Sequence, residues 1–354
     1  MFRLLMAISV VLFAAMFAPK IAAQELDVEP IPVLLPPPQP AAEPEETVKQ
    51  PLIIAHRGAS GYAPEHSMAA VAIAHAQHAD FIEQDVVLTR DHVPVVLHDL
   101  VLDRISNVRD VFPEKHRPNG HYYVMDFSFS ELQQLKLIER SNKEGEQRYP
   151  KRFARDQGHF HVMSLGQQIE LILGLNRSRD HDSGLYVEFK SARWHKKHEY
   201  DVVNSTMGVL ARYGFSDAEP PAPIYLQSFD PEVLRGLKRE FMTSIPLIQL
   251  IAENSWNESE VDYNTMRTAA GLETLRSYAQ GIGVWVNHVY LGLDENGKPK
   301  FSDVVKNAQA AGLQVHVYTL RADDLPEGVE SYQQLKQWLT DLGVDGFFTD
   351  FPDL

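Results

Sequence analysis

Ionisable side chains cluster where short apolar runs of this chain end. Two histidines, three acids and two cations occupy such positions. This inventory suits metal-assisted cleavage of a phosphodiester, in which an acid/base pair flanks a bound cation. The sequence therefore predicts an enzyme. The candidate residues are, in chain order, His56, Arg57, Glu83, Asp85, His98, Glu188 and Lys190.

The three acids predict a metal site. Glu83 and Asp85 are two residues apart in an apolar run that reads as a strand, so both side chains project to one face, and the same holds for Glu188 and Lys190. Buried carboxylates that converge repel one another unless a cation lies between them. The set suits a hard cation, Ca²⁺ or Mg²⁺. A salt-bridge cluster satisfied by Arg57 and Lys190 is the alternative.

The two histidines fit general acid and general base on opposite sides of a scissile P–O bond. His56 is followed by Arg57, whose forked donor suits a phosphate. Most of the remaining histidines, including His75 and His195, are interpreted as surface residues. A zinc site at His159 and His161 is not expected, because no third nitrogen or sulfur ligand has suitable spacing.

The elements that must position these residues alternate between short apolar runs and longer amphipathic ones, as in a parallel sheet built from βα units. The pattern predicts strands at 52–55, 81–88, 185–189, 224–227, 245–251, 282–286, 313–319 and 346–349. It predicts helices at 67–78, 165–175, 200–213, 231–239, 265–279, 302–311 and 332–342. Eight strands with helices between them indicate an α/β TIM (β/α)8 barrel.

Two segments do not follow this alternation of strands and helices. The apolar run 93–97 follows the strand 81–88 after only four residues, so the two must form an antiparallel hairpin, which brings His98 opposite Glu83 to Asp85. The region 103–161 contains prolines, tyrosines and charged runs but no clear barrel strand. We expect an inserted subdomain after the hairpin that shapes access to the barrel mouth.

The N-terminal residues are expected to be processed. Residues 1–23 combine an early arginine, an apolar stretch too short for a membrane span and a small-residue end, which fits a cleaved signal peptide. Residues 24–50 are rich in Pro and Glu and indicate an extended linker, so the catalytic domain is expected at 51–354. No membrane anchor is expected to persist after cleavage. We therefore expect an exported protein, periplasmic in the first instance and secreted in the second.

Composition excludes several functions. The chain has no cysteine, which rules out disulfides and a thiolate metal site. A formal net charge of -15 over 354 residues argues against nucleic acid as a partner, while a small phosphate ester stays acceptable. The oligomeric state stays open, a homodimer included.

Taken together, the chain resembles the glycerophosphodiester phosphodiesterases, specifically the exported bacterial type. The resemblance covers essentially everything after the linker. Many members have Asn where His66 stands, although the exported type resembles this chain there. The matching segments are His56-Arg57-Gly58-Ala59-Ser60-Gly61-Tyr62, Pro64-Glu65-His66-Ser67, Glu83-Gln84-Asp85, Val96-Leu97-His98-Asp99, Tyr225-Leu226-Gln227-Ser228-Phe229-Asp230 and 346–352.

The resemblance implies a TIM barrel that hydrolyses a small glycerophosphodiester to an alcohol and sn-glycerol 3-phosphate. Exported members resemble Ca²⁺ users, so calcium is expected and Mg²⁺ is the second choice. The family's residues fall on His56 and His98 as catalytic pair, Glu83, Asp85 and Glu188 as metal carboxylates, and Arg57 and Lys190 as phosphate-facing cations.

Two other functions stay open beside this one. A phospholipase-like phosphodiesterase would need an apolar rim or basic patch for a membrane surface, and the acidic chain shows no clear one. An exported binding protein could keep the barrel without the chemistry, but the intact histidines and acids speak against it. A glycosidase is less favoured, because Glu83 and Asp85 share one strand rather than facing each other across a sugar.

Overall fold

The computed structural model describes residues 50–155 and 157–354. The predicted signal peptide, 1–23, and all of the predicted linker except Gln50 lie outside the described residues. Among the helices described, none is both long enough and apolar enough to cross a bilayer.

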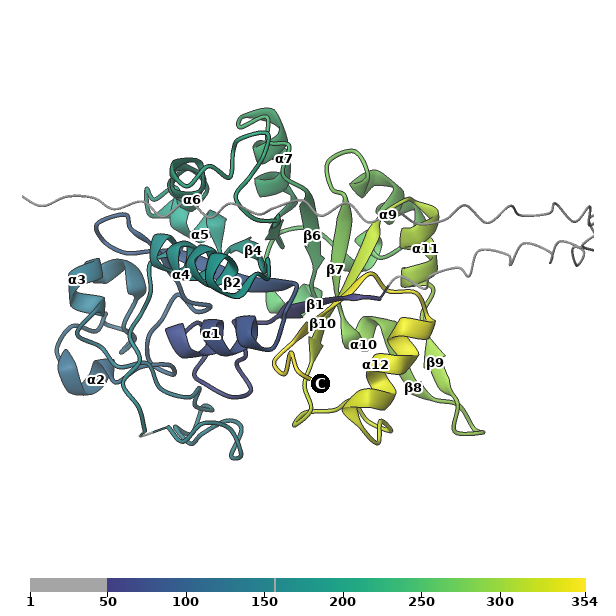
Figure 1. The fold of residues 1–354 in the computed structure, drawn as a ribbon, viewed down its shortest axis with the longest axis horizontal. Helices are drawn as coiled ribbons and strands as arrows, with labels where there is room; N and C mark the ends of the chain where they lie inside the picture. The colour runs from purple at the N-terminus through teal and green to yellow at the C-terminus, as the bar shows by residue number, and fades with distance from the viewer. Residues whose placement is uncertain (1–49, 156) are drawn as a thin grey trace, which may run out of the picture. The chain divides into compact units, whose positions relative to one another are not determined.

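Eight parallel strands form a closed barrel (Figure 1). Every neighbouring pair is parallel, and β1 closes the barrel by pairing with β2 on one side and β11 on the other. The predicted barrel is therefore confirmed. The strands are β1 (Leu52–Ala55), β2 (Phe81–Leu88), β4 (Gly184–Phe189), β5 (Ile224–Ser228), β6 (Leu247–Ile251), β7 (Gly281–Trp285), β10 (Gln314–Leu320) and β11 (Gly346–Thr349).

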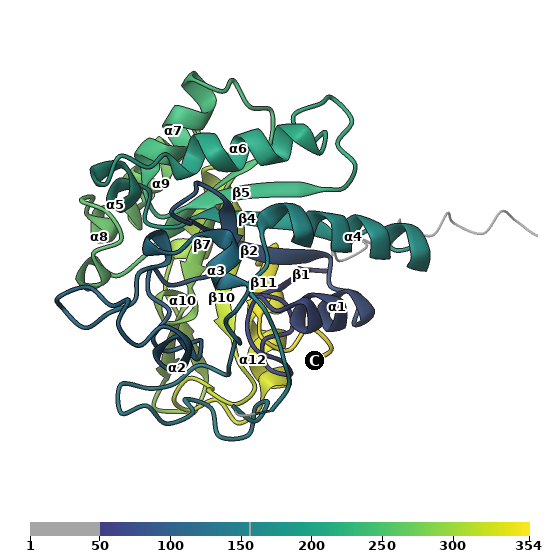
Figure 2. The same cartoon turned by 90° about the vertical axis from the view of Figure 1, so that its left-hand side faces the viewer.

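Helices lie outside the strands; in Figure 2, α6 lies above α4, and α4 lies above α1. Side-chain caps fix their starts: the Ser67 hydroxyl accepts from the Ala70 amide, and Ser164 and Gln167 form a capping box. The longer helices are α1 (Met68–Ala76), α4 (Leu165–Arg179), α6 (Val202–Arg212), α7 (Pro231–Arg239), α9 (Ala269–Leu275), α11 (Val304–Ala310) and α12 (Tyr332–Asp341). The shorter ones are α5 (Ala192–Lys197), α8 (Tyr263–Met266) and α10 (Val286–Val289).

The predicted helix at 265–279 is wrong as a single element. The chain instead forms α8 and α9, separated at Thr268. The Thr268 hydroxyl accepts from the amide of Gly271 at 3.1 Å and so starts a new helix. Gly271 also packs so close to the backbone of Thr265 that a side chain there would clash.

The barrel interior is layered. Five fully or nearly fully buried residues fill the part of the interior away from the carboxyl ends of the strands. Tyr186 stacks on Tyr225 in this layer, with ring centroids 5.0 Å apart. Above them, at the carboxyl ends of the strands, the interior side chains become acidic. The apolar layer consists of Ile54, Phe81, Tyr186, Ile248 and Phe348.

The predicted hairpin is present. The short strand β3 (Pro94–Val96) pairs antiparallel with the end of β2, with Val96 opposite Val86. The amide of Leu97 donates to the carbonyl of Asp85 at 2.9 Å, which holds the residue after it, His98, beside the acids of β2. A second, peripheral hairpin joins β8 (Tyr290–Leu293) and β9 (Pro299–Phe301).

The region 103–161 carries two short helices, α2 (Val108–Val111) and α3 (Phe129–Leu132), and a 3-10 turn at Val124–Asp126. Its apolar side chains form a cluster separate from the main core, built on Val87 and Val95 of the hairpin. Tyr123 stacks on Trp194 of α5, with centroids 5.7 Å apart. That this region is an insertion relative to other barrels stays a prediction.

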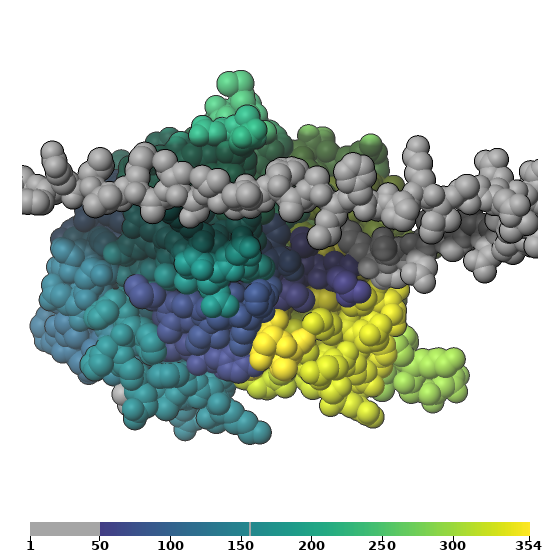
Figure 3. Space-filling view, in the orientation of Figure 1, coloured from purple at the N-terminus to yellow at the C-terminus, as the bar shows by residue number. Residues whose placement is uncertain are grey.

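The beginning and the end of the described chain are neighbours. In Figure 3 the blue-violet residues after β1 lie directly against the yellow C-terminal residues.

The interpretation of His75 and His195 as surface residues is wrong, because both are buried. His75 bonds Asn176 at 2.9 Å, and Nε2 of His195 accepts from the amide of Leu88 at 3.2 Å, so both satisfy polar groups in the core.

Candidate active site

The loop after β1 places the first two candidates. Arg57 has φ 60° and Gly58 has φ 77°, and a side chain at Gly58 would meet the backbone of Ala70 at 2.7 Å. A left-handed Arg57 is a strained conformation of the kind that collects at functional sites. In this conformation its amide donates to Oε2 of Glu83 at 3.0 Å, so the loop is tied to the acids of β2.

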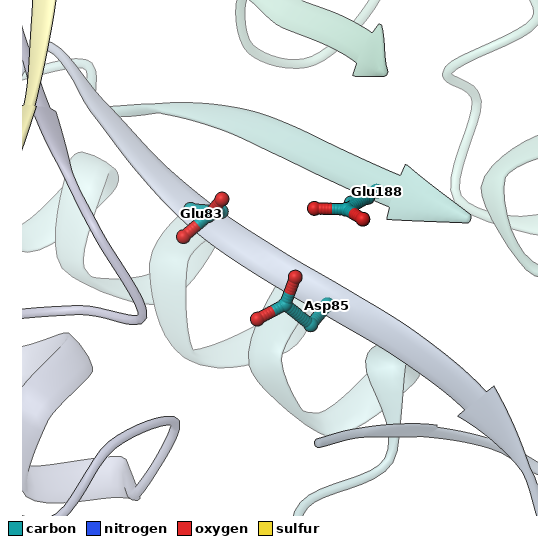
Figure 4. Close-up of side chains that lie close together, drawn as sticks. All are labelled: Glu83, Asp85 and Glu188. Carbon is teal, nitrogen blue, oxygen red and sulfur yellow. The ribbon is translucent and has the colours of Figure 1, made fainter. Parts of the chain in front are cut away.

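Three buried carboxylates meet at the carboxyl ends of β2 and β4. Glu83 and Asp85 project from β2 and Glu188 from β4 toward the same space (Figure 4). One oxygen from each lies within 4.8 Å of the others. Gln227 of β5 donates to Oε1 of Glu83 at 3.0 Å, whereas Oδ1 of Asp85 is buried with no hydrogen-bond partner among the described residues.

The electrostatics of these acids call for a cation. Burial and repulsion from Asp85 and Glu188 raise the pKa of Glu83 well above its usual range. Burial raises the pKa of Glu188 to about 8 in spite of Lys190. Burial opposes ionisation of Asp85 too, but the hydrogen bond from His66 and the charge of Lys190 hold its pKa well below the usual range. Without a cation only part of the set can ionise, and a divalent ion with oxygen ligands would relieve the repulsion.

His56 lies against an aspartate from the other end of the chain. Its Nδ1 is 2.6 Å from Oδ1 of Asp350, and its Nε2 is 3.8 Å from Oε2 of Glu83. Burial disfavours the charged form of Asp350, but Arg321 and His56 hold its pKa well below the usual range. An ionised Asp350 accepts only, so Nδ1 carries the proton and Nε2 presents its lone pair.

His98 has the same kind of partner. Its Nδ1 is 2.6 Å from Oδ1 of Asp99, and its Nε2 accepts from Nζ of Lys190 at 3.2 Å. Burial and the charges of Arg57 and Lys190 lower the pKa of His98 to about 3. Burial and Arg57 likewise lower the pKa of His56 to about 4. Both imidazoles are therefore neutral near pH 7 and can accept a proton.

Both candidate cations are held by acids; Lys190 is buried and Arg57 is partly buried. Lys190 donates to Oε1 of Glu188 at 2.8 Å. Arg57 donates from Nη1 to both oxygens of Glu65 at 3.1 Å, and its Nε lies 3.5 Å from Asp85. Each of these positive charges is thus fixed beside the acid triad rather than free in solvent.

His66 is fully buried and donates from Nε2 to Oδ2 of Asp85 at 2.8 Å. It has φ 58° and lies in the same loop as Arg57, whose carbonyl accepts from the His66 amide. His66 thus orients one of the three acids, which is how an outer residue fixes a metal ligand.

All seven candidate residues lie at the same rim of the barrel. Their individual roles stay predictions. Sequence reasoning missed four residues that bond the candidates directly and two arginines, Arg140 and Arg152, that bond those partners in turn. Asp99 and Asp350 had a signal, since each follows a strand end within a matching segment, but Arg140 had none. The missed residues are Glu65, Asp99, Arg140, Arg152, Gln227 and Asp350.

Comparison with known proteins agrees with this geometry. Residues 56–354 match the model of the glycerophosphoryl diester phosphodiesterase family. A glycerophosphodiester phosphodiesterase of Haemophilus influenzae is 36% identical, with 85% of this chain and 88% of that protein covered. One from Treponema pallidum is 30% identical, with 86% and 90% covered.

Solved structures share the fold. A phosphodiesterase of Oleispira antarctica, crystallised with the product sn-glycerol-3-phosphate, has a TM-score of 0.58 and 23% identity, covering 86% of this chain and 94% of that chain. A glycerophosphodiester phosphodiesterase of Agrobacterium tumefaciens has a TM-score of 0.55 and 20% identity, covering 86% and 98%. The enzyme class expected from the sequence is confirmed: the chain belongs to the glycerophosphoryl diester phosphodiesterase family.

Proposed function

We propose that this enzyme hydrolyses small glycerophosphodiesters to an alcohol and sn-glycerol 3-phosphate, using a divalent metal and two histidines. One observation carries the proposal: two neutral histidines, each bonded to its own aspartate, share a barrel rim with a buried carboxylate triad. The relatives named above support the substrate class, and the product held by the Oleispira structure supports the product.

The two histidine–aspartate pairs divide the proton transfers. In each pair the aspartate fixes Nδ1–H, so that Nε2 is the atom that exchanges a proton with the substrate. One neutral imidazole takes the proton of the nucleophile at its Nε2. The other must first take up a proton at Nε2, which the negative charge of a bound phosphodiester favours, and it then gives that proton to the departing alcohol oxygen. Lys190, which now donates to Nε2 of His98, would turn to the phosphate when substrate enters.

Glu83, Asp85 and Glu188 are the residues that would hold the metal. The orphaned Oδ1 of Asp85 and the raised pKa values of both glutamates fit an oxygen-ligand cation there. When bound, such an ion supplies positive charge at the phosphoryl oxygens and an anchor for hydroxyl groups. Calcium is our first expectation and magnesium our second.

Arg57 and Lys190 would neutralise charge on the phosphoryl oxygens. Both side chains are already ordered by carboxylates, so little side-chain entropy is lost when a phosphate binds.

We also propose that the protein is exported, to a periplasm in the first instance, on the strength of its N-terminal sequence.

Release of sn-glycerol 3-phosphate from glycerophosphocholine by the purified protein tests the proposal. We expect release with Ca²⁺, weaker release with Mg²⁺, and none with a chelator. His98→Gln should lower kcat by about 10²- to 10⁴-fold. His92→Gln, which changes an exposed histidine at the hairpin tip, is the matched control and should behave as wild type. Full release in the presence of chelator, or by His98→Gln, would contradict the mechanism.

A further inference from the structure

Two cavities flank the candidate active site. The first, which we call the arginine cavity, has a volume of about 80 Å³ and is lined by Arg57, Arg140, Arg148, Arg152 and Arg321. The second, the acidic cavity, has a volume of about 460 Å³ and is lined by Asp230, Glu258 and Glu260 together with Glu188 of the triad. A phosphodiester has two arms, and each cavity offers room for one.

The composition of the acidic cavity suits the glycerol arm. Glu188, an expected metal ligand, lies in its wall, and hydroxyl groups of the glycerol are the oxygen donors that a hard cation would take up. Arg193 pairs with Asp230 and Glu260 at 2.6 and 2.7 Å, so Glu258 is left without an ion pair among the described residues. An anionic group would be repelled there.

The arginine cavity shares no lining residue with the acidic cavity and includes His98 in its wall. Four of its five arginines are matched by acids. Glu65 holds Arg57 and Arg140, and Asp350 holds Arg152 and Arg321. Arg148 is exposed and has no acidic partner among residues 50–155 and 157–354; its guanidinium lies 5.1 Å from the ring centroid of Tyr149. One positive charge at this wall is therefore available to a ligand.

A buried acid points to the same conclusion. Glu139 lines the arginine cavity, is 3% exposed, and its Oε2 has no hydrogen-bond partner in the described part of the chain. Burial, against the opposing charge of Arg152, raises the pKa of Glu139 to about 8, so at pH 7 its carboxyl is mostly neutral. A neutral carboxyl can donate a hydrogen bond to an anion, and it does not offset the positive charge of Arg148.

We propose that the arginine cavity receives the head group of the leaving alcohol and favours a head group that carries a second anionic group, a carboxylate or a phosphate. The inference rests on the proposed function. A cavity of about 80 Å³ holds roughly five to eight water-sized groups, since about 10–15 Å³ is needed to hold one water, and so fits a small anionic group better than a sugar.

Two substrate pairs test the inference. Glycerophosphoserine differs from glycerophosphoethanolamine by one carboxylate, and glycerophosphoglycerol 3′-phosphate differs from glycerophosphoglycerol by one phosphate. In at least one pair we expect kcat/KM to be about tenfold higher for the more anionic substrate, the usual worth of a charge-assisted hydrogen bond. The pair that shows the preference identifies the anion.

Variants locate the effect. Arg148→Gln should raise the KM of the more anionic substrate. The ratio of kcat/KM between the two members of the pair should then fall close to one. Lys151→Gln removes the same charge three residues away, on an exposed lysine outside the cavity wall, and should leave the ratio unchanged. Glu139→Gln keeps a donor and should retain the preference, whereas Glu139→Ala should weaken it.

Contrary results separate the two proposals. If both members of each pair are hydrolysed equally, or the less anionic member is preferred, the inference is wrong and the proposed function stands. The same holds if Arg148→Gln and Lys151→Gln change the ratio alike. If no substrate is hydrolysed with any metal, the proposed function fails and the inference falls with it.

Discussion

Arg140 donates from Nη1 to Oδ2 of Asp99 at 2.6 Å, and the other oxygen of Asp99 bonds Nδ1 of His98. Arg140 also donates from Nε and Nη2 to the two oxygens of Glu65, which holds Arg57. One arginine outside the barrel strands thus orients two of the candidate residues through their acid partners.

Arg140→Gln should destabilise the protein by about 3 kcal/mol at pH 7, because a broken buried ion pair leaves charge uncompensated. Burial raises the pKa of Glu65 and of Asp99, but Arg140 and their other partners hold both pKa values below the usual range. Such carboxyls stabilise the fold above their unfolded pKa of about 4, and that stabilisation is lost as the pH falls further. The difference between wild type and variant should therefore shrink only below about pH 4, as urea unfolding at pH 7, 5, 4 and 3 would show.

Arg109→Gln is the control for this prediction. Arg109 pairs with Asp103 at 2.6 Å, but its side chain is 60% exposed. Exposed pairs contribute at most about 1 kcal/mol. Equal losses in the two variants would contradict the role given to Arg140.

Asp350→Asn should lower kcat by about 10²-fold or more with little change in KM. The amide cannot hold Nδ1–H of His56 as the carboxylate does, so the imidazole loses its fixed tautomer. Steady-state kinetics with glycerophosphocholine and Ca²⁺ measure the effect. Asp353→Asn changes a nearby exposed carboxylate that accepts from Tyr62, and it should be near wild type. Similar kcat values for the two variants would refute the assignment.

Calcium should stabilise the fold, by about 2.7 kcal/mol at 100 times its dissociation constant. Glu188→Gln should abolish most of that gain while costing little in the metal-free protein, because burial already raises the pKa of Glu188 to about 8 and the carboxyl is mostly neutral at pH 7. Thermal unfolding with Ca²⁺ and with chelator measures both effects. Glu170→Gln, on the outside of α4, should respond to Ca²⁺ as wild type does. An unchanged response in Glu188→Gln would place the ion elsewhere.

Trp194→Leu should loosen the region 103–161. The indole stacks on Tyr123, whose other neighbour is the guanidinium of Arg117, 4.1 Å from the ring centroid. Losing this aromatic pair removes about 1 kcal/mol beyond the buried area. Limited proteolysis should cut this region faster than in wild type, whereas cleavage within the barrel strands should not change.

Most of the fold could be predicted from the sequence, because each barrel strand has a local signal in its own residues. Runs such as 52–55 are apolar and are followed directly by ionisable residues, and eight strands of this kind are typical of one closed barrel. The break at Thr268 was missed, because it depends on one hydroxyl that competes for the amide of Gly271.

The candidate site was readable only where charge interrupts a strand. Glu83 and Asp85 are conspicuous in an apolar run. Arg140 is one charged residue among many in a segment whose apolar residues have no regular spacing. Its importance follows from three-dimensional contacts with Glu65 and Asp99, distant by 75 and 41 residues. His75 and His195 were misjudged for the same reason, since their partners in the core lie far away in sequence.

The pairing of β1 with β11 has a consequence for when the enzyme becomes active. His56 and Asp350 lie 294 residues apart in the chain and meet only because the last strand closes beside the first. A growing polypeptide carries both histidines, the acid triad and Lys190 well before it carries Asp350. We therefore expect competence for hydrolysis only once synthesis has passed β11, and a chain truncated before Asp350 would hold nearly the whole barrel and lack the partner of its first histidine.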